Sequence, residues 1–119
     1  METYAEIFDK DPFELLDWLS QTFSISIPHK IESVEDMNEA AQLMLTLTGY
    51  YTYLCELLSY AKIAVRQAKR NQTKLEWEDC VDKQVAIDKW LDIVKQQYTA
   101  LSRVVTVRTE NNKELYMSN

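Results

Sequence analysis

The chain contains very little glycine and proline, with one Gly and two Pro among 119 residues. Few tight turns are therefore encoded, which argues against a β-sandwich or barrel and favours a few long helices. A Gly-rich phosphate-binding loop is excluded, because it needs several glycines. The length suits one domain with a single hydrophobic core.

Histidine and cysteine are also scarce. The chain has one His and two Cys, whereas a zinc site needs about four such ligands. We interpret His29 as an exposed linker residue, Cys55 as part of a buried helix face, and Cys80 as a thiol whose acidic neighbours disfavour the thiolate. With no secretory segment recognised and no apolar run long enough for a membrane, we expect reduced thiols, a cytoplasmic location and no metal or cofactor.

The main positive feature is one uninterrupted helical pattern over residues 34–70. Its first apolar stripe contains Val34, Met37, Ala41, Met44, Thr48, Tyr51, Cys55, Leu58, Lys62 and Val65. Its second stripe contains Ala40, Leu43, Leu47, Tyr50, Leu54, Leu57, Ala61, Ala64 and Ala68. Two adjacent stripes form a face too wide for one partner helix, so this helix needs more than one packing partner.

Local residues define the ends of this long helix. Ser33 fits the N-cap, and Lys69 and Arg70 suit the negative end of the helix dipole. Gly49 lies in its middle, where glycine costs about 1 kcal/mol relative to alanine. We expect Gly49 to mark a close crossing of another backbone, with a kink as the alternative.

Shorter elements precede the long helix, and a second long helix follows it. Asp11 and Pro12 begin a short helix within residues 1–32, and an extended linker follows at residues 24–32. After the first long helix (33–71), Thr73 and Glu76 form a capping box that opens a second one over residues 73–107. Residues 104–107 fit a helix end or a short extended piece, and residues 108–119 a polar tail. We predict an all-α domain: a long antiparallel helical hairpin with a short N-terminal helix packed on it, assembled as a homo-oligomer.

Charge is unevenly spread along the chain. Residues 1–40 carry a net charge of −8, residues 41–75 a net charge of +4, and residues 76–119 a net charge of −2. This polarity would draw the acidic end of one copy toward the basic end of another. The overall charge of −6 is unlike the dominant basic footprint of nucleic-acid-binding proteins.

A basic patch near the end of the first long helix is a candidate ligand site. It comprises Tyr60, Lys62, Arg66, Lys69 and Arg70. An aromatic ring with several cations can hold an anionic nucleotide by stacking and ion pairing. The alternative is a solvated face paired with acidic residues across the turn.

A second set of residues is a candidate interface between copies of the chain. It comprises Tyr50, Tyr51, Leu54 and Leu58. Tyr50, Tyr51 and Tyr53 point in three directions around the helix, so at least one should lie outside the intramolecular core. Tyrosine is common at interfaces because it adds contact area and keeps a polar tip.

Two acidic clusters resemble the paired motifs of Mg-dependent helical nucleotide pyrophosphohydrolases. One contains Glu32, Glu35, Asp36 and Glu39, and the other contains Glu76, Glu78, Asp79 and Asp82. Each cluster opens a helix, where the helix dipole favours acids without any metal. In an antiparallel hairpin the two openings lie at opposite ends, so only an oligomer could join them.

Two sequence segments resemble small helical accessory proteins of bacteriophages and other mobile elements. They are Tyr60-Ala61-Lys62 followed by Ala68-Lys69-Arg70, and the stretch from Gln96 to Arg103. This resemblance covers residues 53–117, implies binding to a host component or signal molecule, and carries no catalytic residue across. Our leading hypothesis is a non-enzymatic module that binds or inhibits a host protein. The alternatives are an oligomeric sponge for an anionic nucleotide and the Mg-dependent hydrolase.

Overall fold

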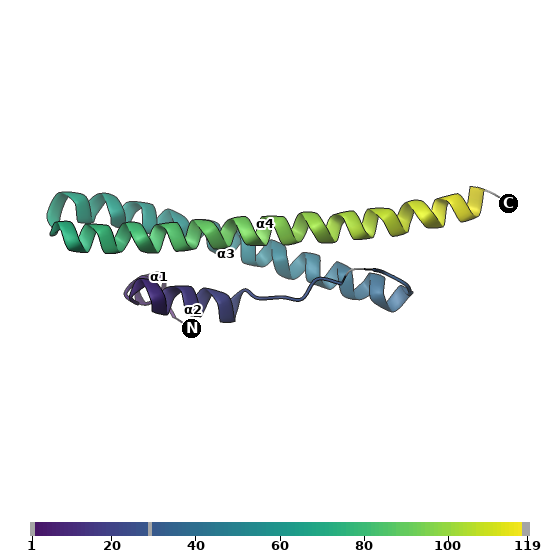
Figure 1. Cartoon of the computed structure of the whole chain (residues 1–119), viewed down its shortest axis with the longest axis horizontal. Coiled ribbons are helices and arrows are strands. Elements are labelled where there is room, and N and C mark those ends of the chain that lie inside the picture. Colours follow the sequence, from purple (N-terminus) through teal and green to yellow (C-terminus); the bar gives the residue numbers. More distant parts are fainter. Residues whose placement is uncertain (1, 29, 118–119) are drawn as a thin grey trace.

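A computed structural model of the chain describes residues 2–28 and 30–117, and the side chains of these residues up to residue 108. Its four helices are α1 (Tyr4–Phe8), α2 (Pro12–Thr22), α3 (Val34–Asn71) and α4 (Lys74–Met117). Helices α3 and α4 form an antiparallel hairpin in a molecule whose longest dimension is 70 Å (Figure 1). The predicted all-α hairpin is confirmed. His29, which we interpreted as an exposed linker residue, lies outside the described residues.

The helices begin where the sequence places their caps. The Ser33 hydroxyl accepts a hydrogen bond from the Asp36 backbone N–H at 3.1 Å. At the start of α4 the predicted capping box is complete: Glu76 N–H donates to Thr73 Oγ1 at 3.2 Å, and Thr73 N–H donates to Glu76 Oε2 at 3.1 Å. The Asp11 carboxylate caps α2 in the same way. These caps satisfy backbone donors that the first helical turn leaves unpaired.

The second long helix extends further than the sequence predicted. Residues 104–107 are helical, and α4 continues to Met117 instead of giving way to a loose tail after residue 107. Val104 and Val105 are partly buried against the core, so their packing outweighs their modest helix propensity. Residues 108–117 contain no glycine or proline that would end a helix.

Gly49 does not mark a helix crossing, and that prediction is wrong. A Cβ atom added at Gly49 would meet no described heavy atom within 4 Å beyond its chain neighbours and the adjoining backbone of α3. The alternative, a kink, does not break α3, which is assigned as one helix from Val34 to Asn71. The glycine therefore leaves open space on the surface of α3.

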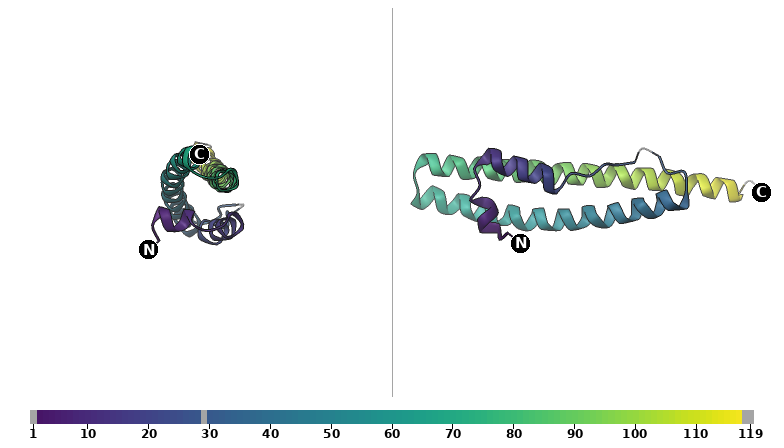
Figure 2. Two further views of the ribbon diagram at one scale, coloured as in Figure 1. Left: turned by 90° about the vertical axis from the view of Figure 1, so that its left-hand side faces the viewer. Right: turned by 90° about the horizontal axis from the view of Figure 1, so that it is seen from below.

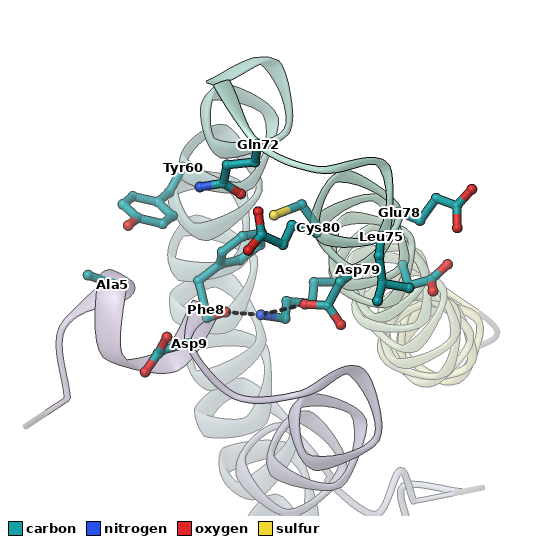
Figure 3. A pocket seen from close by; sticks show the side chains of 12 residues that line it. Ala5, Phe8, Asp9, Tyr60, Gln72, Leu75, Glu78, Asp79 and Cys80 are labelled. Atoms are coloured by element: carbon teal, nitrogen blue, oxygen red, sulfur yellow. Dashed lines mark hydrogen bonds and ion pairs between the residues drawn. The ribbon is translucent and has the colours of Figure 1, made fainter. Parts of the chain in front are cut away.

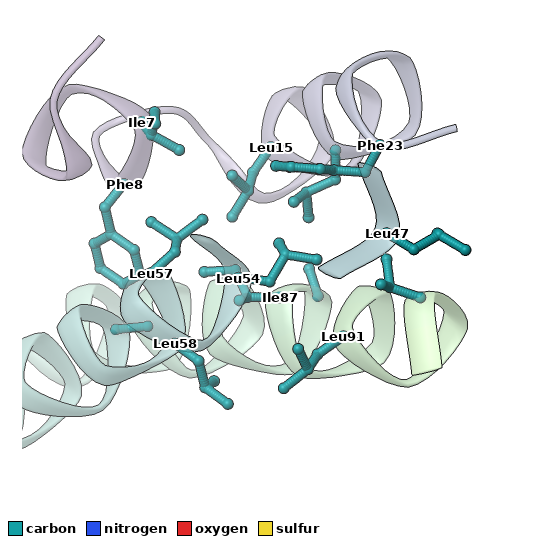
Figure 4. Close-up of a cluster of buried hydrophobic side chains, with 14 of the residues drawn as sticks. Ile7, Phe8, Leu15, Phe23, Leu47, Leu54, Leu57, Leu58, Ile87 and Leu91 are labelled. Carbon is teal, nitrogen blue, oxygen red and sulfur yellow. The ribbon is translucent and has the colours of Figure 1, made fainter. Parts of the chain in front are cut away.

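Helices α1 and α2 and the linker that follows them form what we call the N-terminal arm. The arm lies along one side of the hairpin, so the molecule is roughly triangular in cross-section (Figure 2). The core lies where the arm, α3 and α4 meet (Figure 4). Its most deeply buried side chains are Ile7, Leu15, Leu19, Leu47, Leu54, Leu57, Ile87, Val94 and Leu101. The second stripe of α3 supplies three of these, so α4 and the chain's own arm are its two partners.

Aromatic side chains join the arm to α3. Edge-to-face contacts link Tyr4 to Tyr53 at 5.4 Å, Phe8 to Tyr60 at 5.7 Å, and Phe23 to Tyr50 at 5.0 Å between ring centroids. Such pairs add about 0.5–1.5 kcal/mol each beyond the area they bury. No helix within the described ranges is long and apolar enough to cross a membrane.

Candidate functional site

The hairpin has an open apolar groove on the side that the arm does not cover. Tyr50 and Tyr53 face the arm, and Tyr51 points about 100° away from Tyr50 around the helix. The groove has a volume of about 370 Å³. It is lined by Leu47, Thr48 and Tyr51 from α3 and by Val94, Lys95, Tyr98 and Thr99 from α4.

Two tyrosines and one lysine define the surface of this groove. Tyr51 is 38% exposed and Tyr98 is 39% exposed, so each ring is partly open to solvent. The Lys95 ammonium lies 5.6 Å from the centroid of the Tyr51 ring, within the range of a cation–π contact. The accessible surface of the groove is therefore amphipathic, and the buried side chains of Leu47 and Val94 lie beneath it.

Cations continue along the same side of α3. Lys62, Arg66 and Lys69 are exposed and follow Tyr51 at helical spacings that keep them within about 60° of it. Lys69 lies 5.7 Å from the centroid of the Trp77 ring on α4. Arg70 is also exposed and lies further around the helix. The side of α3 that carries Tyr51 therefore becomes basic near the hairpin turn.

Tyr60 lies apart from these cations. It precedes Lys62 by two positions, which places it about 200° away around the helix axis. Its ring packs on Phe8 at 5.7 Å and on Tyr4 at 6.4 Å, beneath the arm. One chain therefore does not bring the Tyr60 ring together with the basic patch, and nucleotide binding by the cations stays a prediction.

The residues predicted as an interface between copies have different environments. Leu54 is fully buried and Leu58 is 8% exposed, both within the core of one chain. Tyr50 is half-buried against Phe23 of the arm. Tyr51 is the most accessible of the four. Self-association stays a prediction, and in this structure Tyr51 is the residue of that set best placed to support it.

A second, acidic pocket lies beside the hairpin turn, between α1 and the start of α4 (Figure 3). Its volume is about 680 Å³. The polar part of its lining includes Asp9, Glu76, Glu78, Asp79, Asp82 and Lys83. Tyr60 and Phe8 add aromatic surface, so the predicted ligand residue Tyr60 belongs to an acidic pocket rather than a basic one.

Lys83 is the buried cation at the base of this pocket, and the sequence analysis missed it. It is 6% exposed, donates a hydrogen bond to the Phe8 carbonyl oxygen, and forms an ion pair with Asp79 at 3.1 Å (Figure 3). Its ammonium also lies 4.9 Å from the centroid of the Phe8 ring. A detectable pattern existed, because Lys83 precedes the buried Ile87 by four residues and so shares its helix face.

The thiol of Cys80 lines the same pocket. Burial raises the pKa of Cys80, Asp79 and Glu76 raise it further, and Lys83 opposes them. A raised pKa keeps the thiol protonated and weakly nucleophilic at neutral pH. Of the acidic neighbours expected to disfavour the thiolate, Asp79 raises this pKa, but burial is the largest cause and Lys83 acts in the opposite direction.

The two acidic clusters lie at opposite ends of α3, as an antiparallel hairpin requires. Glu35 and Asp36 are in the first turn of α3, and Glu76 is in the first turn of α4. Within the described ranges, no group of three or more His, Cys, Asp or Glu side chains is arranged to hold a metal ion.

Comparisons with known proteins give no family assignment. No protein-family description matches the chain, no curated protein matches it, and no solved structure matches its fold.

Proposed function

We propose that this protein is a non-enzymatic protein-binding module whose α3–α4 groove receives an amphipathic helix of a partner. The observation that supports this proposal is an open apolar groove continued by a row of exposed cations. A helix laid in an apolar groove is a recurrent mode of recognition, read by side chains spaced three and four residues apart.

The groove has the shape and chemistry that such a helix needs. The arm fills one side of the hairpin, and the opposite side corresponds to the position of an additional helix in a bundle. Tyr51 and Tyr98 offer large, rigid rings with polar tips, which are enriched at protein interfaces. Leu47 and Val94 lie buried beneath the groove, so the rings of Tyr51 and Tyr98 supply most of the apolar surface that a partner would contact.

The charge along the groove indicates an acidic partner. Lys62, Arg66 and Lys69 extend from it on α3, and Lys95 borders it on α4. A helix with acidic residues beside its apolar face would complement these cations, which would speed association and fix its orientation. The resemblance to phage accessory proteins suggests that the partner is a host protein.

The proposal is tested by affinity capture from host lysate followed by binding measurements with the purified partner. Tyr98→Glu should abolish capture by placing a charge on the apolar wall. The double variant Lys62→Glu/Arg66→Glu should weaken binding and remove most of its salt dependence. Val85→Glu is the matched control, since Val85 is 61% exposed on α4 and lies outside the groove lining.

A partner captured equally well by the wild type and by Tyr98→Glu would contradict this site. Light scattering on the pure protein measures its oligomeric state and so tests whether a second copy of the chain occupies the groove. If the pure protein is an oligomer and Tyr98→Glu dissociates it, the groove binds a second copy of the chain rather than an acidic partner. Binding that survives both charge reversals would contradict the electrostatic part of the proposal.

A further inference from the structure

A separate pocket lies between the end of α2 and the middle of α3. Its volume is about 520 Å³, and it shares no lining residue with the α3–α4 groove. Four aromatic side chains line it, two from the arm and two from α3: Trp18, Phe23, Tyr50 and Tyr53. We call it the aromatic pocket.

Phe23 holds the other three rings in place. It is 3% exposed and contacts Trp18 at 5.6 Å, Tyr50 at 5.0 Å and Tyr53 at 5.7 Å between centroids. Trp18, Tyr50 and Tyr53 are half-buried, so part of each ring remains open toward the pocket. Rings fixed by mutual packing need little ordering when a ligand binds, which favours affinity.

Gly49 keeps the pocket open, and Glu2 gives it a charge. Apart from the glycine, its two chain neighbours and the adjoining helix backbone, no described heavy atom lies within 4 Å of the position that a Cβ of Gly49 would occupy. Among the described lining residues, Glu2 carries the one formal charge. Glu2 pairs with Lys10 at 3.3 Å, and its own side chain remains 45% exposed, so the carboxylate stays accessible. Burial first, and then the Glu2 and Glu56 carboxylates, raise the pKa of Tyr53, which keeps its hydroxyl neutral.

Aromatic faces combined with one carboxylate suit a large, weakly hydrated organic cation. The negative faces of aromatic rings attract a cation within about 6 Å, and quaternary ammonium groups are recognised in this way. We propose that the aromatic pocket binds a quaternary ammonium group, carried by a choline-like small molecule or by a trimethylated lysine side chain. Neither the groove proposal nor its partner is needed for this inference.

The test is an NMR titration of the ¹⁵N-labelled full chain with choline and with its neutral isostere 3,3-dimethylbutanol. Concentrations up to about 10 mM are suitable, because a few cation–π contacts produce a millimolar site. The Trp18 indole N–H reports on the pocket. The indoles of Trp77 and Trp90, which lie outside its lining, are internal controls. A trimethyllysine peptide and its unmethylated form make up the second arm.

We expect choline to shift the Trp18 resonance and the isostere to leave it unchanged. Gly49→Leu should weaken binding at least tenfold by filling the pocket, whereas Thr52→Leu, at an exposed site on the same helix, should not. Glu2→Gln should weaken binding a few-fold. Tighter binding of the trimethyllysine peptide than of choline would identify a protein ligand, and the reverse a small molecule. Equal shifts from choline and its isostere, or no shift from any cation, would overturn the proposal.

Discussion

Lys83 offers the sharpest test of how the arm is held on the hairpin. Its ammonium bonds the Phe8 carbonyl oxygen at the end of α1 and pairs with Asp79 on its own helix. The substitution Lys83→Met keeps most of the aliphatic stem and removes the charge. The Phe8 carbonyl then loses this donor, and α1 loses a polar link to α4.

The magnitude follows from the exposure of each partner. A hydrogen bond to a charged group contributes about 1.5–3 kcal/mol. The Asp79 side chain is 42% exposed, so its pairing with Lys83 adds no more than about 1 kcal/mol. Removing the buried charge offsets part of this loss of stability, because desolvating an ammonium is costly. We expect a net loss of about 2 kcal/mol, or about 8 °C in Tm for a chain of this length.

Urea denaturation measures the loss, and hydrogen–deuterium exchange locates it. We expect faster exchange in α1 and α2, and little change in α3 beyond the residues that contact the arm. Lys89→Met is the matched control, since Lys89 is an exposed lysine of α4, and its effect should stay within about 0.5 kcal/mol.

An unchanged or increased stability of Lys83→Met would refute the reasoning. It would mean that the free-energy cost of burying the ammonium equals or exceeds the stabilisation from its contacts with the Phe8 carbonyl and Asp79. A double-mutant cycle with Asp79→Asn separates the contributions: a coupling well above 1 kcal/mol would show that the ion pair, rather than the Phe8 carbonyl, dominates.

Three further predictions concern single residues. Gly49→Ala should raise stability by about 1 kcal/mol in urea denaturation, because the site is helical and open; a loss would show that the added methyl group meets a neighbour. Thr73→Ala should lower stability by about 1 kcal/mol through loss of the capping box, whereas Thr73→Ser should retain it, as thermal denaturation will show. The hydrogen bond to Glu56 is the main cause that raises the pKa of Tyr4 from 10.0 to about 12. Because the folded-state pKa is raised, this contact stabilises the fold below pH 10 and is lost as pH rises toward 12. Tyr4→Phe should therefore make stability less sensitive to pH in that window, and an unchanged pH profile would contradict the contact.

Much of the hairpin was predictable because its determinants are local. Ser33 and Thr73 each bond a backbone N–H three residues ahead, so both helix starts are encoded within a single turn. The two apolar stripes correctly indicated more than one packing partner for α3. Periodicity identifies a buried face but does not identify what covers it. The role of the arm, which reserves Leu54 and Tyr50 for the chain's own core, was therefore only partly foreseen.

The candidate sites depended on contacts between distant segments, and these were harder to predict. Tyr60 and Lys62 are only two positions apart in the sequence, but the rotation of the helix places them on opposite sides of α3. No sequence pattern distinguishes a crowded glycine from an open one, and the expected backbone crossing at Gly49 does not occur. The contact between Lys83 and Phe8 joins segments far apart in the chain. The one sign of it in the sequence is the position of Lys83 on the apolar face of α4.

The route of the arm has a consequence for the order of folding. Contacts of the α3–α4 hairpin form outward from a short turn, so each successive contact closes only a small additional loop. The bond between Lys83 and Phe8 instead spans 75 positions, and the bond between Tyr4 and Glu56 spans 52. Closing such loops is entropically expensive until both hairpin helices are in place. The arm, which precedes the hairpin in the chain, is therefore expected to dock last, on helices that are synthesised after it.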